Sequence, residues 1–163
     1  MRRDRPEGPL GHSRNPDRVL PRALSQVHEL PQSGEQAYEE SIRREVFFDF
    51  LDMATRFLDQ VEYRPGATCA GILAGATLEE YVRKLADANG IVTTNSRGEP
   101  VNAAPLNAEL RVKGVYDLSE ELQVRAWIEL RNKTARASRD EFTAEEIRLM
   151  IQGLRDFMIR HPA

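Results

Sequence analysis

Cysteine and histidine are scarce in this sequence of 163 residues. Cys69 is the one cysteine, and the three histidines, His12, His28 and His161, lie far apart along the chain. A single cysteine cannot form an internal disulfide, and the set is too sparse for a Cys/His zinc cage. We therefore expect no metal site and no cofactor, and a reducing cytoplasm is the natural compartment.

Long apolar segments are also lacking. No run approaches the ~20 residues of a membrane span. The chain starts with Met1-Arg2-Arg3 and continues into proline, glycine and charged residues rather than an apolar stretch. These features predict neither a membrane contact through a spanning helix nor a secretory signal.

An excess of positive charge is the third absence. The chain carries 23 Lys and Arg against 26 Asp and Glu, a net charge of −3. This balance excludes a protein that coats nucleic acid through bulk positive charge, so any RNA contact must use a local basic patch. With 40% hydrophobic and 30% charged residues, the sequence predicts one folded domain.

The first 32 residues differ from the rest in composition. They hold five of the nine prolines, and their six arginines against four acids give this segment a net charge of +2. Proline removes backbone donors and forces the preceding residue to be extended, so no long helix is expected here. We predict a flexible arm over residues 1–32, with at most one helical turn at residues 22–30. The arm is either a disordered tail or a segment that wraps a partner.

From Ser33 to Ala163 the pattern is helical. Ser33 and Gln36 have the spacing of a capping box, and the first helix is expected to end at Arg64-Pro65-Gly66. Apolar residues recur behind this cap at spacings of three and four, which predicts a buried stripe: Ile42, Val46, Phe50, Ala54, Phe57 and Val61.

The second helix, at about residues 67–88, begins with small apolar residues. Ala67, Gly71 and Gly75 are four residues apart, and we expect another helix to pack closely against this groove. The helix is therefore predicted to be the centre of a bundle. Its second half is amphipathic and ends at a left-handed Gly90, with Leu78, Val82 and Leu85 facing inward.

Three further helices follow a polar loop at residues 92–104. A short one is expected at residues 105–113, and a fourth begins at a cap on Asp117 or Ser119, with Leu122, Trp127, Leu130 and Thr134 inside. The fifth begins at a Thr143–Glu146 capping box and buries Ile147, Met150, Ile151, Leu154, Phe157 and Met158. No strand pattern is present. The predicted fold is all-α, an antiparallel bundle of four long helices and one short helix.

The sequence lacks the residues that most catalytic mechanisms require. The sequence has no phosphate-binding glycine loop and no dinucleotide fingerprint. A nucleophile–histidine pair needs a histidine in the folded part, where only His161 is present. Adjacent carboxylates point about 100° apart on a helix and make no shared-proton dyad. We interpret three such pairs as solvated faces and partners of helix N-terminal dipoles: Glu79-Glu80, Glu120-Glu121 and Glu145-Glu146.

Residues 131–139 form the one basic segment of the predicted bundle. It holds Arg131, Lys133, Arg136 and Arg139, which together could bind phosphate. The simpler interpretation is a helix end, because basic side chains offset the negative end of the helix dipole.

Arg131 does not fit that simpler interpretation, because its helical neighbours are apolar. An arginine on such a flank is usually paired, since an unpaired buried charge costs several kcal/mol. We expect Glu79 to be its partner. Helical spacing places Arg131 on one wall of a groove, with Asn132 and Arg136, four residues apart, on the other.

The order of these parts resembles the HEPN domains, small helical domains of prokaryotic toxins and RNA-cleaving defence proteins. The resemblance covers residues 33–163 and leaves the arm unexplained. Its motifs are the glycine- and alanine-rich helix of residues 70–80, the 106–110 helix with Gly114-Val115-Tyr116 behind it, residues 131–135, and the final helix from Asp140 to Pro162.

The HEPN motif is an arginine, usually followed by a polar residue, then a histidine after four to six intervening positions. Arg131 matches the arginine and Asn132 the polar residue, while the histidine position holds Arg136, Ala137 or Ser138. The resemblance implies metal-independent RNA cleavage between two copies of the domain. Arg131 would hold the scissile phosphate, and Lys133 and Arg139 would add phosphate contacts.

The missing histidine leaves the activity open. A guanidinium stays protonated and cannot act as a general base, so Arg136 predicts impaired cleavage. The chain is then a natural variant that only binds, an engineered silent form, or a paralogue kept as a partner module. Three hypotheses for the function follow. The first is a HEPN-like endoribonuclease scaffold of a toxin or phage-defence system, which acts as a homodimer and has a cognate antitoxin or defence partner. The second is a silent dimerisation or protein-interaction module, and the third is a bundle with no nucleic-acid role.

Overall fold

The computed structural model describes residues 32–60, 65–136 and 141–163. Within them the chain forms five helices and no strand, and Thr94 and Pro100 make one isolated bridge in the connecting loop. This confirms the predicted all-α fold. The helices are α1 (Gln32–Asp59), α2 (Gly66–Ala88), α3 (Ala103–Val112), α4 (Leu118–Ala135) and α5 (Ala144–Arg160). The predicted arm, except Gln32, which is already in α1, and its helical turn at residues 22–30 lie outside the described residues.

The chain divides into two units, Met1–Ala37 and Tyr38–Ala163. Of the first unit, only the opening residues of α1 are described; the rest of α1 and the other four helices belong to the second. None of the described helices combines the length and the apolar character that crossing a bilayer would require.

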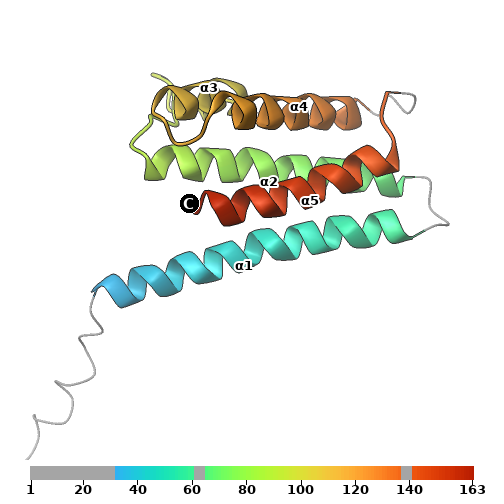
Figure 1. Ribbon diagram of the computed structural model, residues 1–163, viewed down its shortest axis with the longest axis horizontal. Coiled ribbons are helices and arrows are strands. Elements are labelled where there is room, and N and C mark those ends of the chain that lie inside the picture. The colour runs from blue at the N-terminus through green and yellow to red at the C-terminus, as the bar shows by residue number, and fades with distance from the viewer. Residues whose placement is uncertain (1–31, 61–64, 137–140) are drawn as a thin grey trace, which may run out of the picture. The chain divides into compact units, whose positions relative to one another are not determined.

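Helix α2 is the centre of the bundle, as predicted. It packs against α3, α4 and α5, and α3 also packs against α4. Consecutive long helices run antiparallel, as Figure 1 shows, and α2 and α5 lie between α1 and the α3–α4 pair. Helix α1 joins through Phe47, whose ring meets the ring of Tyr81 edge-on at a centroid distance of 5.3 Å.

Helix α5 supplies much of the core, and its inner face matches the prediction residue for residue. Six of its side chains are at most 2% exposed: Ile147, Met150, Ile151, Leu154, Phe157 and Met158. The inward residues Leu78, Val82 and Leu85 of α2 are buried as well. Regular spacing identified these stripes because each helix has only one apolar face.

The predicted inner stripe of α1 is largely wrong. Phe47, Leu51 and Ala54 are buried, whereas the predicted Val46 and Phe50 remain 44% and 40% exposed. Ile42 is exposed too, and Val61 lies outside the described residues. Of the predicted set, only Ala54 is fully buried and Phe57 partly so. The apolar arc of α1 is wider than its contact with the bundle, so spacing alone could not indicate which edge faces the core.

The inner stripe of α4 also needs correction. Trp127 and Thr134 are buried and Leu130 partly so, as predicted, but Leu122 is 49% exposed. Val124 is fully buried in its place. At the start of α4 the inner face therefore holds Glu121 and Val124 instead of Leu122.

The ends of the helices follow local chemistry. Asp117, one of the two predicted caps, accepts a hydrogen bond from the Glu120 backbone at 3.0 Å. Thr143 and Glu146 form the predicted capping box of α5, and Gly90 ends α2 with φ 67°. Helix α1 begins at Gln32, so Ser33 lies inside the helix rather than at its cap.

Two glycines of α2 permit the close approach of α4. A Cβ on Gly71 would overlap the Thr134 methyl group, and a Cβ on Gly75 would overlap Cβ and Cγ of Arg131. The predicted groove along α2 is thus filled by α4. The stem of Arg131 lies directly on the Gly75 backbone, which fixes where its guanidinium can reach.

We predict that Gly75→Ala lowers the free energy of unfolding, as measured by denaturant titration with circular dichroism. Overpacking costs ~1–3 kcal/mol, which should exceed the ~1 kcal/mol that alanine gains over glycine in a helix. In an Arg131→Ala background the Cγ is absent, so the same change should cost less by ~0.5 kcal/mol or more. If Gly75→Ala raised the free energy of unfolding of the otherwise wild-type protein, that result would contradict this packing.

Candidate functional site at the end of α4

Arg131 is held between α4 and α2. Its Nη2 donates to Glu79 Oε2 at 3.0 Å, which confirms the ion pair predicted from the sequence. Gly75 and Glu79 are four residues apart on α2, so one face of that helix receives the arginine stem and then its charge. Both side chains are about one-third exposed, 32% for Arg131 and 30% for Glu79.

The guanidinium retains capacity for a ligand. Its Nη1 donates to Asn132 Oδ1 at 3.2 Å, so two of its five N–H donors have partners among the described residues. The other donors can bind a phosphate oxygen from the exposed side. Arg131 is therefore salt-linked but still accessible to solvent.

A hollow of about 480 Å³ surrounds this end of α4. It brings together four of the predicted site residues, Arg131, Asn132, Lys133 and Arg136, with Glu129 and Ala135 completing the lining. Three cationic side chains thus line this open hollow, together with one carboxylate, Glu129. The other predicted phosphate contact, Arg139, lies outside the described residues. The sequence therefore identified most of this lining, although it did not single out Glu129.

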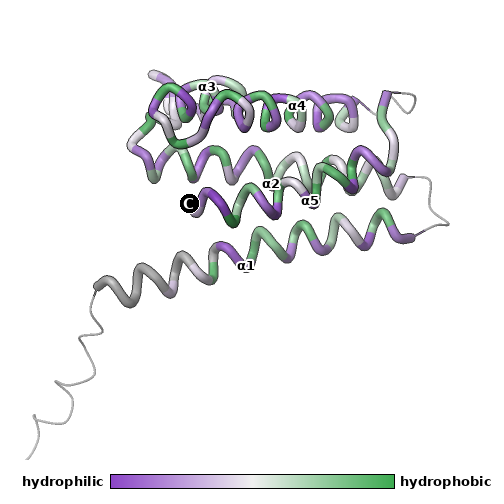
Figure 2. The backbone as a smooth tube through the Cα atoms, in the orientation of Figure 1, coloured by the Kyte–Doolittle hydropathy of each residue, from purple (hydrophilic) through white to green (hydrophobic). Residues whose placement is uncertain are grey.

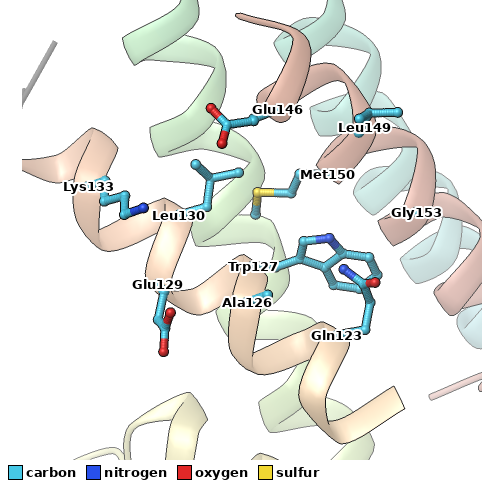
Figure 3. Close-up of a pocket in the computed structure, with 10 residues that line it drawn as sticks. All are labelled: Gln123, Ala126, Trp127, Glu129, Leu130, Lys133, Glu146, Leu149, Met150 and Gly153. Carbon is cyan, nitrogen blue, oxygen red and sulfur yellow. The ribbon is translucent and has the colours of Figure 1, made fainter. Parts of the chain in front are cut away.

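A second hollow, of about 490 Å³, lies between α4 and α5 and was not predicted. Figure 3 shows Trp127 and Met150 between the two helices and Glu129 pointing away from α5. Trp127 is only 6% exposed and lies against Gly153, so its ring has little free face for a stacking ligand. Glu129 and Lys133 border both hollows. The sequence signal that could have indicated this hollow is Leu149, an apolar residue outside the predicted inner stripe of α5, which the structure leaves 58% exposed.

The one histidine of the described residues lies at the opposite end of α4. His161 Nε2 is 2.8 Å from Glu120 Oε1, and Arg160 Nε contacts the same oxygen at 3.1 Å. Glu120 and Arg131 are eleven residues apart on one helix, a separation of about 16 Å along its axis. His161 therefore cannot act at the hollow beside Arg131 within one copy of the chain.

The expectation that all three carboxylate pairs are solvated is wrong for Glu121. Its side chain is 3% exposed and pairs with Arg111 at 2.6 Å and with Arg125. Two guanidiniums and the N-terminal end of the α4 dipole compensate its burial.

A buried polar network surrounds Glu121. Asn107 Nδ2 donates to the Glu121 backbone oxygen at 2.9 Å, and the Tyr116 hydroxyl donates to Asn107 Oδ1 at 2.6 Å. Burial, followed by the charges of Glu121 and Glu120, raises the pKa of Tyr116. These groups satisfy one another, and the cluster joins α3 to α4. In the part of the chain that the structure describes, no three His, Cys, Asp or Glu side chains gather as metal ligands do.

No protein-family model, no curated protein and no solved structure matches this chain. The resemblance to HEPN domains therefore remains a prediction that depends on the sequence motifs.

We predict that the two ion-paired glutamates differ in their effect on stability. Glu79→Gln should lower the free energy of unfolding by less than ~1 kcal/mol, because its pair is partly exposed. Glu121→Gln should cost more, ~1–3 kcal/mol, because its charge-assisted hydrogen bonds are buried. Denaturant unfolding of both variants checks the order. Equal losses would mean that the Glu79–Arg131 pair is a structural element comparable to Glu121.

Proposed function

We propose that this chain is a HEPN-like RNA-binding domain whose phosphate site is the hollow at the end of α4. The observation that supports it is that Arg131, Lys133 and Arg136 all line that hollow, with the Arg131 guanidinium oriented by Glu79 and still open to solvent. Arginine suits this task because its planar donors match two phosphate oxygens at once. The biological setting proposed with it is a bacterial toxin or phage-defence system.

We expect this chain to bind RNA but to cleave it slowly or not at all. Proton transfer by a positioned base contributes typically 10²–10⁴-fold to such a reaction, and Arg136 cannot supply it because its guanidinium is always protonated. Lys133 and Arg136 can still neutralise phosphate charge. The domain is thus proposed to retain RNA with little or no turnover.

A silent interaction module is the second candidate, and a different observation favours it. Val46, Phe50 and Met53 leave an apolar face of α1 exposed, at 44%, 40% and 47%. Such faces mark protein contacts more often than nucleic-acid contacts. A measurement of RNA binding distinguishes the two functions. Both hold if the domain binds RNA and also binds a protein partner.

We predict that Arg131→Gln weakens RNA binding about tenfold and reduces its salt dependence by about one charge, because one phosphate contact is lost. Glutamine keeps the Cβ and Cγ that pack on Gly75. The matched control is Arg160→Gln, which also removes an arginine paired to a glutamate, Glu120, but at the opposite end of α4. Fluorescence anisotropy with a short single-stranded RNA at several salt concentrations measures both. Equal losses would indicate diffuse electrostatic attraction and contradict a site at Arg131.

Arg136→His tests the proposed loss of the catalytic base. Arg136 is exposed and follows the last turn of α4, so the change should leave the fold intact. We expect RNA cleavage in the presence of EDTA, with 2′,3′-cyclic phosphate ends, that wild type lacks. Arg136→Gln is the control, since it removes the charge without adding a base. A folded Arg136→His variant that binds RNA but never cleaves it would exclude the HEPN-type mechanism at this position.

A further inference from the structure

The hollow between α4 and α5, here the α4–α5 hollow, adjoins the hollow beside Arg131. Glu129 and Lys133 line both of them, so a ligand held in one can extend into the other. Figure 2 shows hydrophobic and hydrophilic positions interleaved along α4 and α5, the two helices that border the α4–α5 hollow. This hollow has no part in the phosphate site, and its volume of about 490 Å³ is that of a small-ligand pocket.

The walls of the α4–α5 hollow are largely apolar. Leu130 of α4 lines it together with Leu149 and Met150 of α5, and Leu149 is 58% exposed. Trp127 lies between the two helices, as Figure 3 shows, and its ring packs on the bare backbone of Gly153. The ring is therefore fixed in place, and the wall exists before any ligand arrives. Apolar walls of this kind suit a ligand with flat apolar faces.

The two hollows differ in charge. Three cationic side chains and one carboxylate line the hollow beside Arg131, whereas one cation, Lys133, and two carboxylates, Glu129 and Glu146, line the α4–α5 hollow. A phosphate group is attracted by the first set and repelled by the second. The α4–α5 hollow therefore suits an uncharged group that is attached to a phosphate. A nucleobase is such a group, since it has apolar faces, a polar edge and no charge.

Lys133 lies at the junction of the two hollows. Glu129 is four residues before it, a spacing at which ion pairs often form on a helix. Figure 3 shows instead that the Lys133 ammonium group is directed toward Leu130 and the Glu129 carboxylate away from α5. Lys133 and Leu130 are three residues apart, about 4.5 Å along the helix axis. One nucleotide can therefore place its phosphate at Lys133 and its base against Leu130.

We propose that the α4–α5 hollow binds a base of single-stranded RNA whose adjoining phosphate lies at Arg131. The inference rests on the proposed RNA-binding function and extends it from the phosphates to the bases. The strand is single because its base must be unstacked to enter. Leu130 and Leu149 pack against the base, since Trp127 has little free face. Gln123, exposed at the rim, can both donate to and accept from a base edge.

Fluorescence of the full chain tests the base subsite, because Trp127 is its one tryptophan and lines this hollow. A pentamer of uridine would be compared with an oligomer of the same length and charge whose riboses carry no bases. Wild type should bind the pentamer about tenfold more tightly, because one base is held in addition to the phosphates. Only the pentamer should change the Trp127 fluorescence, and anisotropy of labelled oligomers measures both affinities.

Leu149→Ala should reduce the preference for the pentamer about fivefold and leave the affinity for the abasic oligomer unchanged, because it removes apolar contact and no charge. The matched control is Ile159→Ala, since Ile159 is another exposed apolar residue of α5 and does not line the hollow. Equal affinity of wild type for both oligomers, or a full preference in Leu149→Ala, would overturn the base subsite and leave the phosphate site standing. Binding of neither oligomer would overturn both.

Discussion

The close approach of α4 to α2 at Gly75 is the contact on which the rest of the molecule depends. A side chain at that position would occupy the space of the Arg131 stem. Because the stem lies on bare backbone, the guanidinium reaches Glu79 one turn further along α2 and remains partly exposed. The place of the Arg131 guanidinium in the proposed phosphate site follows from this packing. Glycine has a low helix propensity, and the close packing of α4 explains why α2 nevertheless has glycine at position 75.

The fold was predictable where a helix has one apolar face, and α5 is the clearest example. Helix α1 was not, since it has two adjacent apolar stripes and periodicity does not tell which one meets the core. The edge-on contact of Phe47 with Tyr81 selects the buried one. On α4, Glu121 is buried and its neighbour Leu122 is exposed, and the two arginines from α3 and α4 together with the helix dipole compensate the buried charge. The spacing of residues within one helix does not predict such charge compensation by a neighbouring helix.

Part of the candidate site could also be predicted from the sequence. The apolar neighbours of Arg131 required a partner, and Glu79 is that partner. Helical spacing likewise placed Asn132 and Arg136 at one hollow. The Glu120–His161 contact could not be predicted, because it depends on where the end of α5 meets the start of α4. That contact holds His161 far from Arg131, so within the described residues no histidine reaches the hollow beside Arg131.

The orientation of the Arg131 guanidinium toward an incoming phosphate is the central claim, and side-chain NMR tests it most directly. Arginine Nε–H resonances would be followed while a short single-stranded RNA is titrated in. The account predicts early, saturable shifts for Arg131 and Arg136, with Arg160 and Arg111 unchanged at the same RNA concentrations. Parallel shifts of all arginines, or an Arg131 resonance that stays still while RNA binds, would contradict it.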